Sequence, residues 1–412
     1  MREIDLAIVG DIAWNKDITP QGQRTSPGGA AYYSAAGASH FSEKVGVVGR
    51  IGEDFDLSLL QKRHIDVEGV IVVPEEETCR FVLTQYLDNT RDFEAIRGVA
   101  GIVQTDIFPD RYLSARFIHL PTQLPEHSIT WLDFLSHHNG ISVDSFEEFT
   151  RQWPELTKEM FRRANIIFTN EEEWKTLSMF GVEFAEKPII IKRGKGGATY
   201  KNGSESITIS APSVTAIETT GAGDVLAGAF LAQRVQDVPI GSALENAVNL
   251  ASLSVQAFGI EHIPPKEAMI KKPHIITAAL LVNTSGEVFL AASPKFGGKL
   301  IVPGGHFLPG ETPEECIIRE VEEETGINVD RSNLRFLKMH EIYAPEYHGT
   351  GARFIGYNYW LFINDQTIRL EENEFSSCLF VDPNEALKLP DLHPSARKII
   401  QYYLEERDRT LR

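Results

Sequence analysis

The sequence predicts a two-domain α/β protein, in which a doubly wound, mainly parallel sheet with a small β lid precedes a smaller α/β domain. Three observations predict this class. The chain has 412 residues, which is more than one hydrophobic core usually organises. Strand-like and helix-like segments alternate up to about Ile260, as they do when helices cover both faces of a parallel sheet. A polar stretch with a Pro pair, 261–274, then interrupts this alternation.

The first domain is predicted to span residues 1–262. Its strand-like segments are short and apolar, and they occur at 5–11, 44–49, 117–120, 140–144, 165–170 and 188–194. Helix-like segments occur at 30–41, 153–164 and 241–258. Residues 77–98 instead alternate polar and apolar side chains, which predicts antiparallel strands with one solvated face and hence a lid.

The second domain is predicted to span residues 273–412, after a linker at 263–272. It opens with the apolar strand 275–282, which a turn at Asn283–Gly286 joins to the next strand. A helix is expected to begin at Thr312, where Glu315 completes a capping box and Pro313 takes the first helical position. Gly326 is expected to end it.

Composition and charge exclude several classes of protein. A formal net charge of -18 and a pI near 5.2 argue against a nucleic-acid binder, which needs clustered Lys and Arg. Cys79, Cys316 and Cys378 are too few and too widely spaced for a disulfide framework. The N-terminal residues lack the apolar core of a signal peptide, and no apolar run approaches the roughly 20 residues that span a bilayer. We therefore expect a cytoplasmic protein that acts on small molecules, without nucleic-acid or membrane partners.

The most informative stretch of the first domain is TTGAGD, 219–224, where a Gly-rich turn leads into a helix. Gly221, Ala222 and Gly223 let backbone N–H groups approach an anion, and a helix N-terminus adds partial positive charge. The Asp224 carboxylate is well placed to take a proton from an attacking hydroxyl. Taken alone, the stretch fits equally well an ordinary turn with Asp224 as the helix N-cap.

Three further stretches favour the functional interpretation. They are a Gly pair before a small-residue helix (27–38), an acidic run after a strand (170–174), and a strand followed by a Gly-rich turn (191–200). Their order and spacing resemble the ribokinase (PfkB) family of sugar and nucleoside kinases over residues 1–262. The resemblance implies a ribokinase-like fold and Mg²⁺- or Mn²⁺-dependent transfer of a phosphoryl group from ATP to a sugar or nucleoside hydroxyl.

The resemblance assigns roles to individual residues. Asp224 is similar to the family's catalytic base, and the residues that resemble its anion hole are Gly221, Ala222 and Gly223. The residues that resemble the ATP- and Mg²⁺-binding groups are Asn170, Glu173, Lys192, Gly194, Gly197 and Asn249. Those that resemble acceptor-binding groups are Asp11, Asn15, Asp17, Gly28 and Gly29. Among the three polar candidates near the N-terminus, Asn15 aligns best.

The resemblance leaves two properties open. Glu218 stands where the family usually has Asp, at the position linked to activation by a monovalent cation. Relatives often form homodimers through the lid, so a homodimer is a candidate assembly for this chain as well.

The second domain concentrates acid in REVEEETGI, 319–327. At about 100° per residue, Glu320, Glu323 and Glu324 share one face of the predicted helix, whereas Glu322 points away and is expected to be solvated. Three carboxylates on one stripe raise one another's pKa values when no counterion is present. A hard cation such as Mg²⁺ or Mn²⁺ suits oxygen-only ligands. A solvated acidic helix balanced by Arg319 is the alternative.

The residues around this helix favour the metal site. The Nudix pattern G-x5-E-x7-R-E-U-x-E-E-x-G-U fits at every fixed position, namely Gly305, Glu311, Arg319, Glu320, Val321, Glu323, Glu324, Gly326 and Ile327. The chain therefore resembles Nudix hydrolases over about 273–412, which implies an α/β/α sandwich and Mg²⁺-dependent hydrolysis of a nucleoside diphosphate linked to another group.

The Nudix resemblance also assigns roles. It implies that Glu320, Glu323 and Glu324 are metal ligands, that Glu323 and Glu324 are catalytic, and that Arg319 and Glu311 brace the loop and helix. Gly304 and Gly305 let the backbone approach the metal. Family members often recruit a further acid, for which Glu371, Glu372 and Glu374 are candidates and Glu372 is favoured among them. An exposed acidic loop without such a role is an equally good alternative. Leu300 replaces a Trp that many members carry, which leaves the hydrolysed substrate open.

The complete sequence thus predicts a bifunctional enzyme. The first domain would phosphorylate a sugar or nucleoside with ATP, and the second would hydrolyse a pyrophosphate bond in a nucleoside diphosphate derivative. The alternative is an active kinase that carries a non-catalytic, nucleotide-sensing Nudix module.

Overall fold

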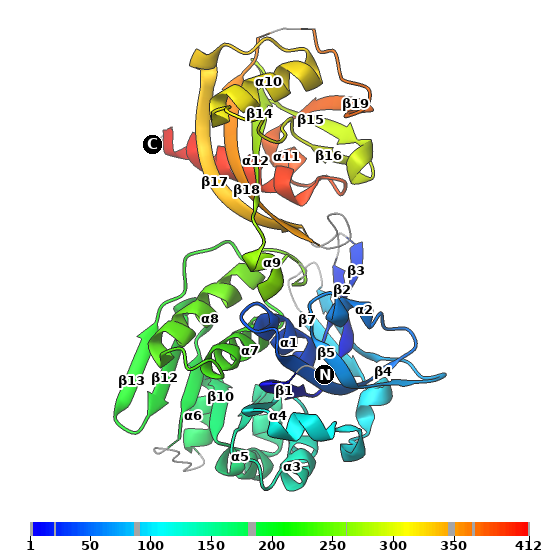
Figure 1. Ribbon diagram of the computed structural model, residues 1–412, viewed down its shortest axis with the longest axis vertical. Helices are drawn as coiled ribbons and strands as arrows, with labels where there is room; N and C mark the ends of the chain where they lie inside the picture. The colour runs from blue at the N-terminus through cyan, green and yellow to red at the C-terminus, as the bar shows by residue number, and fades with distance from the viewer. Residues whose placement is uncertain are drawn as a thin grey trace. The chain divides into compact units, whose positions relative to one another are not determined.

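A computed structural model of the chain describes residues 3–19, 22–85, 91–179, 187–260, 262–344, 351–364 and 367–410. The chain divides into two compact units, Met1–Ile270 and Lys271–Arg412, which are described separately. Figure 1 shows their elements in chain order.

A nine-stranded sheet forms the centre of the N-terminal unit, in the order β13-β12-β11-β10-β9-β8-β1-β4-β5. From β11 to β5 all neighbours are parallel, whereas β12 and β13 form an antiparallel edge. The strands are β1 (Leu6–Val9), β4 (Val45–Gly52), β5 (Asp66–Val73), β8 (Phe117–Leu120), β9 (Ile141–Asp144), β10 (Ile166–Asn170), β11 (Ile189–Lys192), β12 (Ala198–Asn202) and β13 (Glu205–Ile209). The carboxyl ends of the parallel strands therefore meet at one edge of the sheet, which is where ligands bind in such folds.

Helices cover both faces of this sheet, as Figure 1 shows. Alternate residues of β1 belong to opposite cores, because Leu6 and Ile8 pack in one cluster and Ala7 and Val9 in the other. The first cluster includes side chains of α1 (Ala30–Ser39), α7 (Ala222–Arg234) and α8 (Ile240–Ser254). The second includes side chains of α3 (Pro125–Phe134), α5 (Pro154–Arg163) and α6 (Glu171–Met179), and α4 (Glu147–Gln152) contacts the last two. This burial on both faces explains why the strands read as continuous apolar runs.

A separate four-stranded sheet, in the order β3-β2-β6-β7, forms the predicted lid. Its strands are β2 (Ala13–Thr19), β3 (Gly22–Gly28), β6 (Cys79–Gln85) and β7 (Arg91–Ile96). The prediction from 77–98 is confirmed for β6 and β7, but β2 and β3 were not predicted. Their residues include Asn, Asp, Gly and Pro, which are depleted in strands. The long-range pairing of β2 with β6 organises them instead.

Residues 263–272 were predicted to be a linker, and the first of them pack onto the N-terminal unit. Ile263 is fully buried, and its carbonyl accepts a hydrogen bond of 2.8 Å from the buried Arg63 guanidinium. The Pro264 carbonyl accepts another from His40 Nδ1 at 2.6 Å. The short helix α9 (Lys266–Ile270) follows, and Glu267 pairs with His64.

The C-terminal unit is an α/β/α sandwich, as expected. Its sheet has the order β16-β15-β14-β18-β17, and β19 also pairs with β15. Leu281 and Phe289 pack beneath α10, whereas Leu280 and Leu290 pack beneath α12. The elements are β14 (His274–Val282), β15 (Val288–Ser293), β16 (Lys299–Ile301), α10 (Pro313–Thr325), β17 (Leu334–Ala344), β18 (Ala352–Phe362), β19 (Ser377–Val381), α11 (Pro383–Ala386) and α12 (Pro394–Thr410). Across the described residues of both units, every helix is too short or too polar to cross a membrane.

Candidate active sites

The TTGAGD turn begins α7 at the carboxyl edge of the N-terminal sheet. Gly221 is the residue before the helix and has a left-handed backbone, with φ of 75°. A Cβ at this position would lie 2.3 Å from the Tyr33 ring, so glycine is required both for the turn and for the close approach to α1. Gly29, before α1, has φ of 90°, and a Cβ there would lie 2.4 Å from the Asp11 carbonyl oxygen. The two Gly turns thus begin two helices, α1 and α7, that contact each other.

Asp224 lies in the first turn of α7 with its Oδ1 atom buried and, among the described residues, without a hydrogen-bond partner. Burial raises the pKa of this carboxyl, and the negative charge of Asp144 raises it further, whereas Lys192 lowers it. A buried carboxylate with a free oxygen and a raised pKa can accept a proton near neutral pH.

Lys192, at the end of β11, pairs with Asp144, at the end of β9. Its Nζ atom lies 2.7 Å and 2.6 Å from the two Asp144 carboxylate oxygens. The sequence analysis included Lys192 but missed Asp144. The available signal was its position as the last residue of an apolar parallel strand, which places it at the same sheet edge as Lys192.

Asn170 and Glu173 contact each other at the start of α6. The Glu173 backbone N–H donates to Asn170 Oδ1 at 2.9 Å, and the Asn170 N–H donates to Glu173 Oε2 at 2.8 Å. This reciprocal arrangement is that of a capping box, so the two residues also stabilise the helix start. Glu173 is buried and accepts a further bond of 2.6 Å from the Ser145 hydroxyl. Burial raises its pKa, and the charge of Lys192 opposes that shift.

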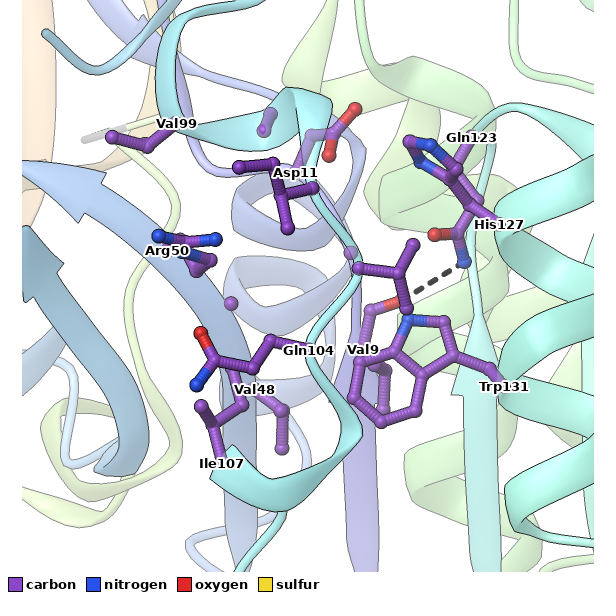
Figure 2. A pocket seen from close by; sticks show the side chains of 15 residues that line it. Val9, Asp11, Val48, Arg50, Val99, Gln104, Ile107, Gln123, His127 and Trp131 are labelled. Carbon is purple, nitrogen blue, oxygen red and sulfur yellow. Dashed lines mark hydrogen bonds between the residues drawn. The ribbon is translucent and has the colours of Figure 1, made fainter.

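Asp11 lines a cavity at the end of β1, shown in Figure 2. Arg50, Gln104 and His127 also line it, and Trp131 forms part of its wall. Burial raises the pKa of Asp11 to about 6, and Arg97 opposes the shift. The cavity has a volume of about 30 Å³ and Trp131 is buried in the core, so the space beside Asp11 suits water molecules rather than a ring.

The other predicted acceptor residues lie on the lid. Asn15 is buried and donates to the Tyr33 hydroxyl at 2.8 Å, and its Oδ1 atom has no partner among the described residues. A Cβ at Gly28 would lie 2.4 Å from the Asn15 side chain. Burial raises the pKa of Asp17, Arg24 opposes the shift, and the Asp17 charge in turn raises the pKa of Glu218. Asp17 therefore lies on the Glu218 side, away from Asp11 in its cavity.

The remaining nucleotide-binding candidates are spread more widely. Gly194 and Gly197 have positive φ angles of 52° and 87° in the turn after β11. A Cβ at Gly197 would lie 2.0 Å from the Ile209 carbonyl oxygen, so this turn packs against β13. Asn249 is exposed on α8, and its adenine-pocket role stays a prediction.

In the C-terminal unit, α10 forms as predicted. Thr312 and Glu315 make the capping box, Pro313 opens the helix, and Gly326 ends it with a left-handed φ of 70°. Of the four crowded acids, Glu322 is exposed, but it is not merely solvated, because its Oε1 atom accepts a hydrogen bond of 3.2 Å from the Val329 N–H. That bond anchors the chain after the helix and was not predicted.

Arg319 braces this site. Its guanidinium donates to the two Glu311 carboxylate oxygens at 2.6 Å and 3.0 Å, and to the His306 carbonyl at 3.1 Å. The hydrogen bonds from Arg319 lower the Glu311 pKa to about 2. Arg319 also pairs with Glu320 at 2.8 Å and with Glu323 at 3.1 Å. In the described part of the chain, no group of three His, Cys, Asp or Glu side chains is arranged to hold a metal ion. The Arg319 guanidinium contacts both Glu320 and Glu323 and so lies between these two acids.

The acids nevertheless fit a divalent cation. Burial raises the pKa of Glu320, although Arg319 opposes this shift, and burial raises that of Glu324 to about 8. Glu324 accepts a bond of 3.0 Å from the Gly304 N–H, and a Cβ at Gly305 would lie 2.4 Å from the Glu320 carboxylate. The Gly pair thus leaves the space that these acids need, and oxygen donors suit Mg²⁺.

The favoured extra acid, Glu372, is exposed on a turn. Its neighbour Glu374 is half-buried and pairs with Lys295, and the Glu374 charge raises the pKa of Glu324. The geometry therefore favours Glu374 over Glu372 as the acid that joins the site. Sequence alone could not separate them, because both lie in the same short acidic segment.

Comparison with known proteins agrees with this geometry. Residues 4–267 match the family model described as pfkB family carbohydrate kinase, which covers well over half of the chain. The chain belongs to the pfkB kinase family. In this pfkB kinase a second model, described as NUDIX domain, matches residues 272–403, so the protein combines a kinase domain with a Nudix hydrolase domain.

Curated relatives exist for both domains of this pfkB–Nudix protein. The cytidine kinase of Thermococcus kodakarensis is 30% identical over 248 residues, which are 56% of this chain and 88% of that protein. The 8-oxo-dGTP diphosphatase of Proteus vulgaris is 34% identical over 90 residues, which are 21% of this chain and 79% of that protein. The crystal structure of the Methanocaldococcus jannaschii nucleoside kinase, a ribokinase-family member, has a TM-score of 0.58, 21% identity, and covers 64% of this chain and 96% of its own. That structure confirms the predicted ribokinase-like fold.

Proposed function

We propose that this pfkB–Nudix protein phosphorylates a nucleoside hydroxyl with ATP in its N-terminal domain, and hydrolyses a nucleoside diphosphate derivative in its C-terminal domain. The observation that carries the first activity is the buried Asp224 carboxylate, with one oxygen free, at the start of α7. The observation that carries the second is the set of three acids on one face of α10, braced by Arg319.

In the kinase reaction, Asp224 accepts the proton of the acceptor hydroxyl as that oxygen attacks the γ-phosphorus of ATP. The bond between the γ-phosphorus and its bridging oxygen breaks, and ADP leaves with the electron pair. The backbone N–H groups of the Gly221–Gly223 turn and the α7 N-terminus stabilise the charge that develops on the transferred group. The raised Asp224 pKa makes the carboxylate a stronger proton acceptor than an exposed aspartate.

A nucleoside is the acceptor that the site supports best. The similar T. kodakarensis protein is a cytidine kinase, and the polar side chains of Asp11, Gln104 and His127 lie near one another at the end of β1. Asn15 and Gly28, which lie together on the lid, would contact the sugar. The turn at Gly29 packs closely against the Asp11 backbone, and it thereby fixes the position of Asp11 relative to the lid residues Asn15 and Gly28.

In the hydrolase domain, Glu320, Glu323 and Glu324 would hold a divalent cation, together with the backbone at Gly304. When bound, such a cation polarises a phosphate oxygen and lowers the pKa of water. Arg319 keeps the acids in place and Glu311 keeps Arg319 in place. Glu374, held by Lys295, is the residue we assign to move a proton at this site.

Other properties follow from the same assignment. The ATP site would use Mg²⁺ held through Asn170 and Glu173. Glu218 has a buried Oε1 atom without a partner among the described residues, and a monovalent cation could bind near it. Comparing kinase rates in K⁺ and Na⁺ tests this binding. The homodimer, the cytoplasmic location and the absence of nucleic-acid partners stay predictions.

Two single substitutions in the full chain test the two activities against each other. Asp224→Asn should abolish ATP-dependent phosphorylation of cytidine or related nucleosides and leave Mg²⁺-dependent hydrolysis of nucleoside diphosphate derivatives to nucleoside monophosphate unchanged. Glu323→Gln should do the reverse. If wild type and Glu323→Gln form nucleoside monophosphate equally slowly across the substrate panel, the C-terminal domain is a sensing module and the hydrolase assignment fails.

A further inference from the structure

The Asp144–Lys192 pair crosses the central strand of the active-site edge. Asp144 ends β9 and Lys192 ends β11, and β10 lies between them in the sheet. Neighbouring strands are about 4.8 Å apart, so the two backbones are separated by roughly 10 Å. The lysine side chain must therefore extend over the end of β10 to reach the carboxylate, with Nζ atom distances of 2.7 Å and 2.6 Å to its oxygens.

This extended side chain passes directly under the GAGD turn. A Cβ at Gly223 would lie 3.1 Å from Lys192 Cδ and 3.2 Å from its Nζ atom. Lys192 also lowers the pKa of the Asp224 carboxyl, and Asp144 raises it. The ammonium group thus lies beside the turn that carries Asp224.

Of the two side chains in this pair, only that of Lys192 is exposed to solvent. The Asp144 side chain is fully buried, whereas 15% of the Lys192 side chain is exposed. An ammonium group has three donors, and the two bonds to Asp144 leave one of them available. Burial acts to lower the Lys192 pKa, but Asp144, Glu173 and Asp224 more than offset this effect, so Lys192 stays charged at neutral pH.

The acidic side chains around Lys192 make a positive charge necessary when ATP binds. Asp144, Glu173 and Asp224 place three carboxylates around one lysine. A polyphosphate that enters this space is repelled by those acids and attracted by Lys192. In phosphoryl transfer, a fixed positive charge contributes most where negative charge develops on the transferred group and on the leaving oxygen.

We propose that Lys192 contacts the γ-phosphoryl group during transfer, and that Asp144 is a positioning residue that holds Lys192 extended beneath the Gly221–Asp224 turn. This inference rests on the proposed kinase function and deepens it. During the reaction the acceptor oxygen forms its bond to the γ-phosphorus, its proton moves to Asp224, and the electron pair of the broken bond stays on ADP. Lys192 remains protonated throughout, and Asp144 remains ionised.

The test is a double-mutant cycle in the full chain with Lys192→Met, Asp144→Asn and the combined variant. Because Lys192 acts on the transferred group, Lys192→Met should lower kcat about 10²-fold and change the nucleoside KM less than about threefold. The combined variant removes both charges and should recover the thermal stability lost in either single variant, but its kcat should stay as low as that of Lys192→Met. Lys201→Met, on the exposed part of β12, is the control and should match wild type.

The pH dependence tests whether the pair acts electrostatically on Asp224, and the drop in kcat tests the contact of Lys192 with the transferred group. Lys192 lowers and Asp144 raises the pKa of Asp224, while Glu173 also raises it. The acidic limb of kcat/KM should therefore move to higher pH in Lys192→Met and to lower pH in Asp144→Asn.

Three outcomes would overturn the inference. They are a Lys192→Met kcat within about threefold of wild type, an effect on the ATP KM alone, and a combined variant whose kcat recovers together with its stability. A failure of the proposed kinase function is distinguishable, because it appears either as absent nucleoside phosphorylation in wild type or as an unaltered rate in Asp224→Asn. If Lys192→Met does not fold, Lys192→Arg keeps the charge but changes its position, and a kcat equal to wild type would then reject the required placement.

Discussion

At the scale of single residues, both sites place one cation among three acids, but they differ in how the remaining groups are charged. In the kinase domain a buried lysine is surrounded by three acids, and its charge opposes the effect of burial on Asp224. In the hydrolase domain Arg319 contacts Glu311, Glu320 and Glu323, while Glu324 is buried away from it and accepts only a backbone N–H bond among the interactions described above. Glu324 is therefore the acid whose ionisation depends most on an added cation.

Glu374 and Glu372 form a matched pair for testing the hydrolase site. Glu374 is close enough to raise the Glu324 pKa, whereas Glu372 is exposed. Glu374→Gln should lower kcat for pyrophosphate hydrolysis by 10-fold or more, an order-of-magnitude expectation for loss of a proton-transfer group, and Glu372→Gln should leave it within about twofold. Steady-state rates at saturating Mg²⁺ measure both. Equal rates for the two variants, or the greater loss in Glu372→Gln, would restore Glu372 to the role predicted from the sequence.

At the scale of elements, the contact between α1 and α7 determines the kinase site. The two Gly turns that begin these helices hold Asp11 and Asp224, so their relative position depends on how closely the helices cross. A Cβ at Gly37 would lie 2.4 Å from the Val225 carbonyl oxygen, and one at Gly228 would lie 1.8 Å from the Ser34 carbonyl oxygen. Neither backbone atom can move without moving its helix, which explains glycine at both positions.

Gly228→Ala should therefore destabilise the N-terminal unit by about 3 kcal/mol, the upper part of the usual overpacking range. Kinase activity should fall with it, and hydrolysis of nucleoside diphosphate derivatives by the C-terminal domain should stay unchanged. Urea unfolding followed by loss of kinase activity measures the effect. Gly241→Ala is the control, since no atom lies within 4 Å of that added Cβ; the helix propensity of Ala should make it neutral or slightly stabilising. A Gly228→Ala unfolding midpoint equal to that of Gly241→Ala would contradict the close crossing.

The structure also shows which elements the sequence could predict. The helix 313–325 formed with its predicted ends, because its cap, its first-turn Pro and its terminal Gly are local signals. Strands β2 and β3 were missed, because their residues have weak strand preference and they form by pairing within the lid. Local chemistry predicts an element, and long-range pairing decides whether a weak segment joins a sheet.

At the scale of the whole molecule, the boundary between the units lies after α9. Residues 263–264 satisfy Arg63 and His40 of the N-terminal unit, and Ile263 is buried. The polar, Pro-containing composition of 263–272 predicted an exposed linker. Residues 263–264 instead pack onto the N-terminal unit, and the exposed part of the segment lies beyond them. The two compact units, Met1–Ile270 and Lys271–Arg412, divide there.

Two fragments of the kinase domain test this boundary. The fragment 1–270 should fold and phosphorylate its acceptor, whereas 1–262 leaves the buried Arg63 guanidinium without the Ile263 carbonyl. A hydrogen bond to a charged group contributes about 1.5–3 kcal/mol, and the buried Ile263 side chain is lost with it, so 1–262 should unfold at a lower temperature in a calorimetric scan. Identical melting temperatures and kinase rates for the two fragments would show that residues 263–270 contribute nothing to the unit.

The sequence by itself determined both families, and it predicted the catalytic role of Asp224 and the metal-binding role of the three acids of α10, because each of these depends on spacing within one short segment. Only the tertiary structure decided that Asp144 belongs beside Lys192, that Glu374 rather than Glu372 lies near Glu324, and that residues 263–264 belong to the kinase unit. These groups meet across strands or loops distant in the chain, and their contacts follow from packing and desolvation, which local spacing does not encode.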